Sequence, residues 1–393
     1  MTRTSSLVIA LCFLCASGLA AQRIGLPFPL KVLEESAARD SNDAAAHYNV
    51  ALGYWNEKRY DEAERSLRLA MALDGQFAEA HLALAFLPYA RQPKLWKEDR
   101  RDKVPQEWKA ALDESEREYR RAFYINPFVD LRIIGAVMPR DESSWRFDYP
   151  GFYQLFQKPY DDLLAGNYPM AYQGFERLEQ QWSYTARGPL PRHVYWFKAL
   201  SAARIGKIDQ AMVAIDKLLG EQERYEKENS EKLMRTELRT NDYRYIKAIL
   251  LQAQGKKEEA IATFRVVLEH DLGMYMAHVR MAALYEGDKQ WPEAVAERQN
   301  AANANPDDPN LLIDLGVTAG RAGEIEMALD ALGRAGEANP RLAGAPYWSA
   351  MIQLGQGNRD EAKRSLLQFL AIAPSSWQGK IDLAKQRLQE LPQ

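Results

Sequence analysis

A 34-residue period runs through the C-terminal part of the sequence. Pro306, Pro340 and Pro374 lie 34 residues apart, and each closes a stretch with the same layout of charged, small and apolar residues. Self-similarity at a fixed period of this size is the signature of repeat architectures, in which each unit contacts only its neighbours. The period therefore favours one elongated array over the two or three separate cores that 393 residues would otherwise suggest.

Small residues recur at two fixed places in four contiguous units, which begin at Asn241, Tyr275, Pro309 and Ala343. One place holds Ala260, Ala294, Ala328 and Ala362, and the other holds Ala248, Ala282, Gly316 and Ala350. Between them comes a place that suits a left-handed turn residue, occupied by Gly255, Lys289, Gly323 and Gly357. Each unit therefore predicts a helix, a tight turn and an antiparallel helix whose axes approach closely.

This layout resembles the tetratricopeptide repeat family, whose unit is a helix-turn-helix of the same length. Residues 44–77 fit it through the stretch "YDEAERSL", and residues 152–185 and 192–225 fit it more loosely. A further unit, which begins at Ala78, is stretched by an insert. The resemblance implies an all-α fold, a right-handed α-solenoid of stacked antiparallel helix pairs.

Matching successive stretches of the chain to this repeat predicts the domain order. The predicted segments are a signal peptide at 1–21, an N-terminal segment at 22–43, an irregular array at 44–225 with inserts at 90–107 and 139–151, a charged helical extension at 226–240, four contiguous repeats at 241–376 and a C-terminal capping helix at 377–393.

The first residues predict export. Arg3 precedes an apolar run from Leu7 to Ala16, and small residues follow as far as Ala21. This pattern is typical of a secretory signal peptide, and the apolar run is shorter than the ~20 residues of a membrane-spanning helix. We therefore expect a periplasmic or extracellular protein with no integral membrane segment once the signal is removed. Both cysteines, Cys12 and Cys15, lie in the leader, so packing alone must hold the mature chain together.

The charge pattern and the histidines argue against several functions. The formal net charge is -3 and no polybasic tract is present, which argues against nucleic acid as a partner. The five histidines show no metal-ligand spacing, and glycine-rich phosphate-binding motifs are absent from the sequence. We expect no metal, no cofactor and no enzymatic activity.

In the family that the sequence resembles, the first helices of successive repeats line a concave groove that receives a partner segment. The second, fifth, ninth and twelfth places of several units therefore become candidates for binding. They are Tyr48, Leu52, Trp55, His193, Trp196, Leu200, Asp242, Tyr245, Ile249, Gln252, Tyr347 and Met351. This lining is largely aromatic and aliphatic, although residues of these types in first helices also serve in packing between repeats.

The resemblance and the leader together favour a non-enzymatic scaffold of the bacterial cell envelope that binds a peptide or a partner protein in the groove. Two alternatives remain open at this point. The aromatic-rich region 145–197 offers rings on which a glycan or small ligand could stack. The insert 139–151 carries Arg140, Asp141, Glu142, Arg146 and Asp148, which are residue types that an enzyme could use.

Overall fold

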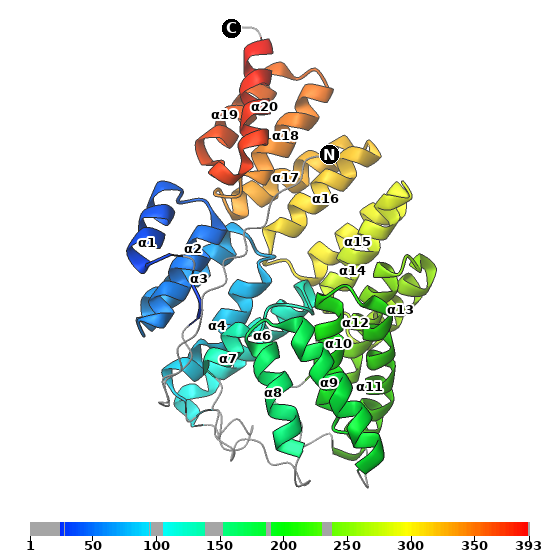
Figure 1. Ribbon diagram of the computed structural model, residues 1–393. Helices are drawn as coiled ribbons and strands as arrows, with labels where there is room; N and C mark the ends of the chain where they lie inside the picture. Colours follow the sequence, from blue (N-terminus) through cyan, green and yellow to red (C-terminus); the bar gives the residue numbers. More distant parts are fainter. Residues whose placement is uncertain are drawn as a thin grey trace.

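The computed structural model describes residues 24–26, 28–93, 95, 105–137, 152–185, 190–229 and 238–391. Within these ranges every regular element is helical (Figure 1). The helices are α1 (Leu30–Arg39), α2 (Ala44–Asn56), α3 (Tyr60–Leu73), α4 (Ala78–Arg91), α6 (Gln106–Ile125), α7 (Arg132–Val137), α8 (Phe152–Leu164), α9 (Tyr168–Thr185), α10 (Arg192–Arg204), α11 (Ile208–Asn229), α12 (Thr240–Ala253), α13 (Lys257–His270), α14 (Tyr275–Gly287), α15 (Trp291–Ala304), α16 (Pro309–Ala322), α17 (Ile325–Ala338), α18 (Gly344–Gly355), α19 (Arg359–Ile372), the 3₁₀ turn η3 (Ser375–Trp377) and α20 (Gln378–Glu390).

Consecutive helices pack as hairpins, and the hairpins stack. The hairpins are α2 with α3, α4 with α6, α8 with α9, α10 with α11, α12 with α13, α14 with α15, α16 with α17, and α18 with α19. The second helix of most hairpins also contacts the first helix of the next, as α3 does with α4 and α15 with α16. Between the α4–α6 and α8–α9 hairpins, the short helix α7 contacts both α4 and α8. The predicted solenoid of stacked helix pairs is therefore confirmed.

The turn inside each C-terminal hairpin has the left-handed residue that the sequence predicts. Gly255, Gly323 and Gly357 have φ angles of 75°, 85° and 77°. Lys289 occupies the same place with φ 58°, although a side chain in this region costs about 1–2 kcal/mol. The left-handed turn conformation is therefore kept at this position even where lysine replaces glycine.

The small residues lie where the two helices of a hairpin cross. The four alanines Ala260, Ala294, Ala328 and Ala362 are fully buried. At Gly316 a Cβ atom would lie 2.6 Å from Leu332 Cγ and 2.9 Å from the carbonyl oxygen of Ala328. Glycine therefore permits an approach of α16 to α17 that a larger residue would prevent.

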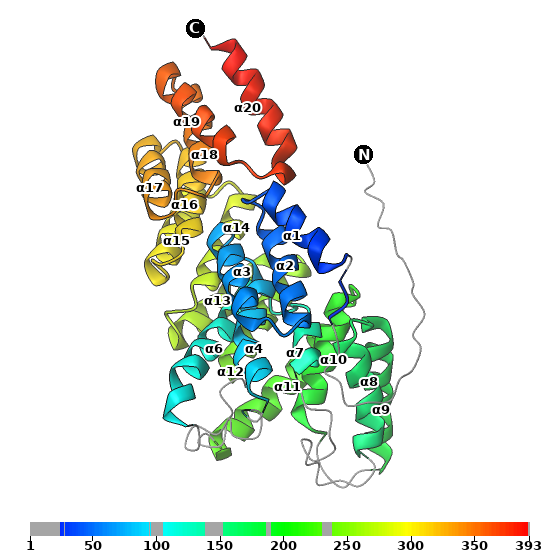
Figure 2. The same cartoon turned by 90° about the vertical axis from the view of Figure 1, so that its left-hand side faces the viewer.

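The solenoid curls back on itself. In Figure 1 the N-terminal helices α1–α4 (blue) lie beside the C-terminal repeats, whereas α8–α11 (green) lie at the opposite end. Helix α6, which follows α4 in the N-terminal half, contacts α14 of the C-terminal repeats. Figure 2 shows α1–α3 again close to the C-terminal helices. The largest buried apolar cluster includes residues from Ile24 to Leu311, while smaller clusters lie among α15–α17 and α18–α20.

Some predicted segments lie outside the described residues. These are the signal peptide at 1–21, the insert 139–151 and most of the insert 90–107. Of the charged extension 226–240, residues 226–229 continue α11, and 230–237 are outside the described ranges. In the part of the chain that is described, none of the helices has the length and apolar character needed to cross a membrane.

The close approach at Gly316 predicts opposite outcomes for two glycine substitutions. Gly316→Ala should destabilise the protein by about 1–3 kcal/mol, because the new methyl group meets backbone as well as a side chain. Gly333→Ala in α17 should stabilise it by about 0.5–1 kcal/mol, because a Cβ there has no neighbour within 4 Å and alanine favours the helix. Urea unfolding of both variants checks the pair, and a Gly316→Ala protein as stable as the parent would contradict the crossing geometry.

Candidate functional site

The first helices α12 and α14 hold the end of helix α6. The hydroxyl of Tyr245 donates to the carbonyl oxygen of Tyr124 at 2.6 Å, and Arg280 donates to that hydroxyl at 3.0 Å. A second nitrogen of Arg280 donates to the carbonyl oxygen of Ile125 at 3.1 Å. The last carbonyls of a helix lack partners within the helix, so these contacts satisfy groups that would otherwise be left unpaired.

An ion pair supports the same contact. Arg120 of α6 lies 3.2 Å from a carboxylate oxygen of Asp242, which is 6% exposed. Burial raises the pKa of the Asp242 carboxyl above its ordinary value, and the charge of Arg120 opposes that rise. Two predicted groove residues, Asp242 and Tyr245, therefore contact a helix, and that helix belongs to the same chain.

The other predicted groove residues are buried or half-buried, and aromatic ones among them pack on neighbouring rings. Trp196 packs between the rings of Phe123 and Tyr243, with centroid distances of 5.7 Å to both. Tyr48 packs on Phe77 at 4.9 Å. Leu52, Trp55, Leu200 and Tyr347 are buried, whereas Ile249, Gln252 and Met351 are half-buried. The structure distributes the predicted set over α2, α10, α12 and α18, largely as contacts between repeats.

His193 lies in an aromatic cluster formed by α8, α9 and α10. Its imidazole meets the edge of Phe156 at 5.2 Å and lies 6.1 Å from Phe197. Burial, together with a smaller contribution from the neighbouring charge of Arg192, lowers the pKa of His193 to about 4. The imidazole is therefore neutral at physiological pH and behaves as part of the core.

The same cluster bears on the predicted glycan site. Phe156, Tyr160 and Phe175 are at most 5% exposed, and their rings pack on one another and on Phe197. These described rings of the region 145–197 thus offer little surface for a sugar. Residues 138–151 lie outside the described ranges, and within those ranges His, Cys, Asp and Glu do not gather in a group of three that could hold a metal ion.

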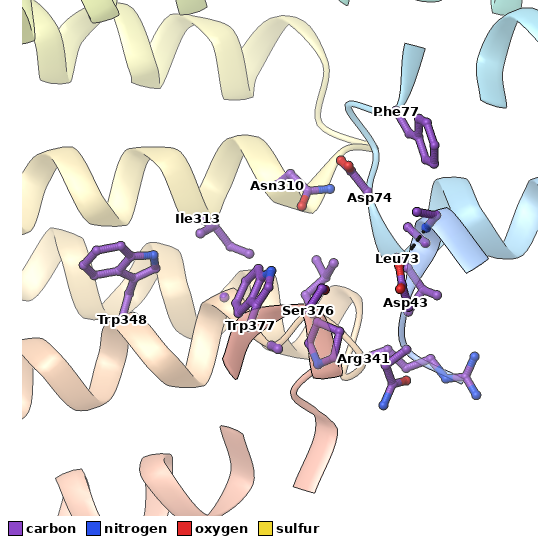
Figure 3. A pocket seen from close by; sticks show the side chains of 17 residues that line it. Asp43, Leu73, Asp74, Phe77, Asn310, Ile313, Arg341, Trp348, Ser376 and Trp377 are labelled. Atoms are coloured by element: carbon purple, nitrogen blue, oxygen red, sulfur yellow. Dashed lines mark hydrogen bonds between the residues drawn. The ribbon is translucent and has the colours of Figure 1, made fainter. Parts of the chain in front are cut away.

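An open cavity of about 420 Å³ lies where the two ends of the solenoid meet. One wall comes from the start of α2 and the turn after α3, and the other comes from α16, α18 and the segment around η3 (Figure 3). Trp348, Trp377, Ile313 and Phe77 project toward it. The remaining lining residues are Asn42, Asp43, Ala44, Ala45, Leu73, Asp74, Asn310, Arg341, Leu342, Ala343, Gly344, Pro374 and Ser376.

Polar contacts between backbone and side chains link the two walls. The side-chain amide of Asn339 donates to the carbonyl oxygen of Ala72 at 2.5 Å, and the amide of Ser375 donates to Asp40 at 2.6 Å. Gly75 lies so close to Asp308 that a Cβ would come within 2.5 Å of its Oδ1. Glycine at this turn therefore allows the N-terminal wall to reach α16.

Sequence reasoning missed this cavity, although a signal for part of it was present. Asn310 and Ile313 occupy the second and fifth places of the unit that begins at Pro309, and Gly344 occupies the second place of the last unit. The groove rule takes the second, fifth, ninth and twelfth places of a unit as binding candidates. Applied to every unit, it would have found these three residues. Nothing in the period indicates that Asp74 or Phe77, from the other end of the array, faces them.

Comparison with known families identifies the repeats at both walls. Sequence models of the tetratricopeptide repeat match residues 44–77 and residues 347–376. The chain is a tetratricopeptide repeat protein. In this tetratricopeptide repeat protein the first match covers the α2–α3 hairpin and the second covers most of the α18–α19 hairpin, so the two matched repeats lie on opposite sides of the cavity.

Solved structures resemble parts of this tetratricopeptide repeat protein. The C-terminal part of a repeat-containing protein from Cytophaga hutchinsonii is 15% identical, covering 60% of this chain and 95% of that chain with a TM-score of 0.46. MamA residues 41 to the end, from Desulfovibrio magneticus RS-1, are 19% identical, covering 46% and 92% with a TM-score of 0.36. No curated protein sequence matches the chain. At these values the likenesses indicate no function.

Removing one hydroxyl should loosen the contact between α6 and the first helices. Tyr245→Phe leaves the Tyr124 carbonyl and the Arg280 guanidinium without their shared partner, so we expect a loss of about 1–3 kcal/mol in unfolding free energy. Tyr347→Phe is the matched control, because Tyr347 has the same repeat position in the last unit and lies outside the α6 contact; its change should stay within about 0.5 kcal/mol. Urea denaturation measures both, and equal losses would show that the α6 contact is not the cause.

The neutral imidazole of His193 predicts sensitivity to acid. Its folded pKa of about 4 lies below the ordinary value of 6.5, so the unfolded chain binds more protons between these values. The contribution of His193 is therefore complete above pH 6.5, and about 1–3 kcal/mol is lost as the pH falls toward 4. His193→Phe should flatten this part of the stability profile, whereas His270→Gln, at the exposed end of α13, should leave it unchanged. A parental profile in His193→Phe would assign the acid sensitivity to other groups.

Proposed function

We propose that the chain is an exported, non-enzymatic scaffold that holds a segment of a partner protein in the cavity between its two ends. Tetratricopeptide repeat proteins bind other proteins and are typically non-enzymatic, so the repeats themselves support a protein-interaction scaffold. Export is supported by the signal-peptide pattern of residues 1–21.

The observation that carries it is the docking of α6 on α12 and α14. There the first-helix face of this solenoid holds a helical segment through a partly buried ion pair and through Tyr245 and Arg280, which hydrogen-bond its terminal carbonyls. The same face continues onto α16 and α18, where Ile313 and Trp348 line an open cavity. A surface that binds one segment at α12 and α14 therefore has room for a second segment at α16 and α18.

The size and lining of the cavity fit a peptide segment. A volume of about 420 Å³ lies within the range of sites that enclose small molecules or a few side chains. Aromatic side chains such as Trp348 and Trp377 are the residue type that dominates binding energy at protein interfaces. Polar residues at the rim orient the bound segment through hydrogen bonds and charge interactions.

Site-specific photo-crosslinking tests the proposal. A benzoylphenylalanine replacing Trp348 should crosslink a discrete partner protein in cells, and the crosslinked chain should be recovered with exported proteins and lack residues 1–21. The same photoreactive residue replacing Leu367 of α19, which is 53% exposed and does not line the cavity, is the control and should give no such product. The proposal fails if position 348 yields no partner, or if both positions yield the same products.

A further inference from the structure

The cavity combines aromatic walls with carboxylates at its mouth. Trp348, Trp377 and Phe77 supply the rings, and Asp43 and Asp74 supply the carboxylates (Figure 3). Arg341 is the only basic residue in the lining, and its side chain is directed away from the two tryptophans (Figure 3). The described lining therefore carries two negative charges against one positive charge.

Each of these two carboxylates accepts a hydrogen bond from a backbone amide. Neither forms an ion pair with a basic side chain among the described residues. Asp43 accepts from the amide of Ala45, and Asp74 accepts from the amide of Gln76, each at 2.9 Å. Behind Asp74 lies Asp308, whose Oδ1 accepts from Asn310 at 3.0 Å. Its Oδ2 is buried without a hydrogen-bond donor among the described residues.

The electrostatic surroundings of Asp74 favour the binding of a positive charge. Partial burial raises the pKa of Asp74 above its ordinary value, and the carboxylate of Asp308 adds to the rise. The imidazole of His81 acts in the opposite direction, and its Nδ1 already contacts Glu118 at 2.5 Å. A cation near Asp74 would therefore be stabilised by the carboxylates of Asp74 and Asp308.

The protein itself shows how an ammonium group binds beside these rings. The Nζ atom of Lys380 lies 3.6 Å from the centroid of the Trp377 ring and 5.4 Å from that of Tyr347. An aromatic ring attracts a cation through the negative potential of its face, most strongly for tryptophan. Lys380 takes one such site on Trp377, and Trp348 lines the cavity nearby.

From these charges and rings we propose that the cavity recognises a partner segment that presents a lysine or arginine next to a large apolar side chain. The apolar side chain packs against Ile313 and the tryptophans, the stem of the basic residue follows the aromatic wall, and its charged end meets Asp74 and Asp43. This inference rests on the proposed function and adds the chemistry of the partner.

Two synthetic peptides that differ in one residue test the charge. The probes are acetyl-Gly-Ser-Leu-Lys-Phe-Ser-Gly-amide and the same peptide with norleucine in place of lysine, titrated by calorimetry into the full mature chain. The lysine peptide should bind about 2- to 30-fold more tightly at low salt, and the difference should shrink at high salt. Equal affinities, tighter binding of the norleucine peptide, or binding of neither peptide would overturn the inference.

Three variants locate the effect. Asp74→Asn should remove most of the preference for lysine, whereas Asp330→Asn, the same charge change on the exposed face of α17, should keep it. Arg341→Ala should tighten binding of the lysine peptide about two-fold and leave the norleucine peptide unchanged, because it removes the like charge in the lining. Circular dichroism confirms that each variant is folded. A preference unchanged in Asp74→Asn overturns the inference, while a crosslink from position 348 would still support the proposed function.

Discussion

The architecture depends on a close approach between the two helices of each hairpin, where small residues lie at the crossing. Ala260, Ala294 and Ala328 are fully buried at these crossings, and Gly316 leaves no room for a methyl group. Because each hairpin is thin, its remaining apolar surface must be covered by the next hairpin. Stacking in a constant direction then curves the array until its ends approach each other.

That curvature gives the first-helix face two different roles. At α12 and α14 it is filled by the end of α6, whose terminal carbonyls are held by Tyr245 and Arg280. At α16 and α18 the N-terminal hairpin stops short of it, and the cavity between them stays open. The docked helix α6 thus serves as an internal example of the binding that we propose for a partner segment.

The N-terminal helices meet the C-terminal repeats at a seam beside the cavity, and this seam differs from the interior of the array. Within the array, most buried apolar residues belong to one extensive cluster, but across the seam the direct contacts include the polar pairs Asn339 with Ala72 and Ser375 with Asp40. Polar contacts at a partly exposed seam contribute modestly to stability, so the two walls are held in position mainly by the stack that connects them. The cavity is therefore a property of the whole array.

The sequence alone determined the hairpins and much of their detail, because every feature of a hairpin is local. The turn at Gly323, the crossing at Gly316 and the length of each unit all follow from residues within one 34-residue window. Only the tertiary structure decided where the array meets itself, since that depends on small rotations summed over many hairpins and on an irregular middle part. For this reason the groove rule named Asp242 and Tyr245 without showing that α6 covers them, and no pattern placed Asp74 opposite Ile313 and Trp377.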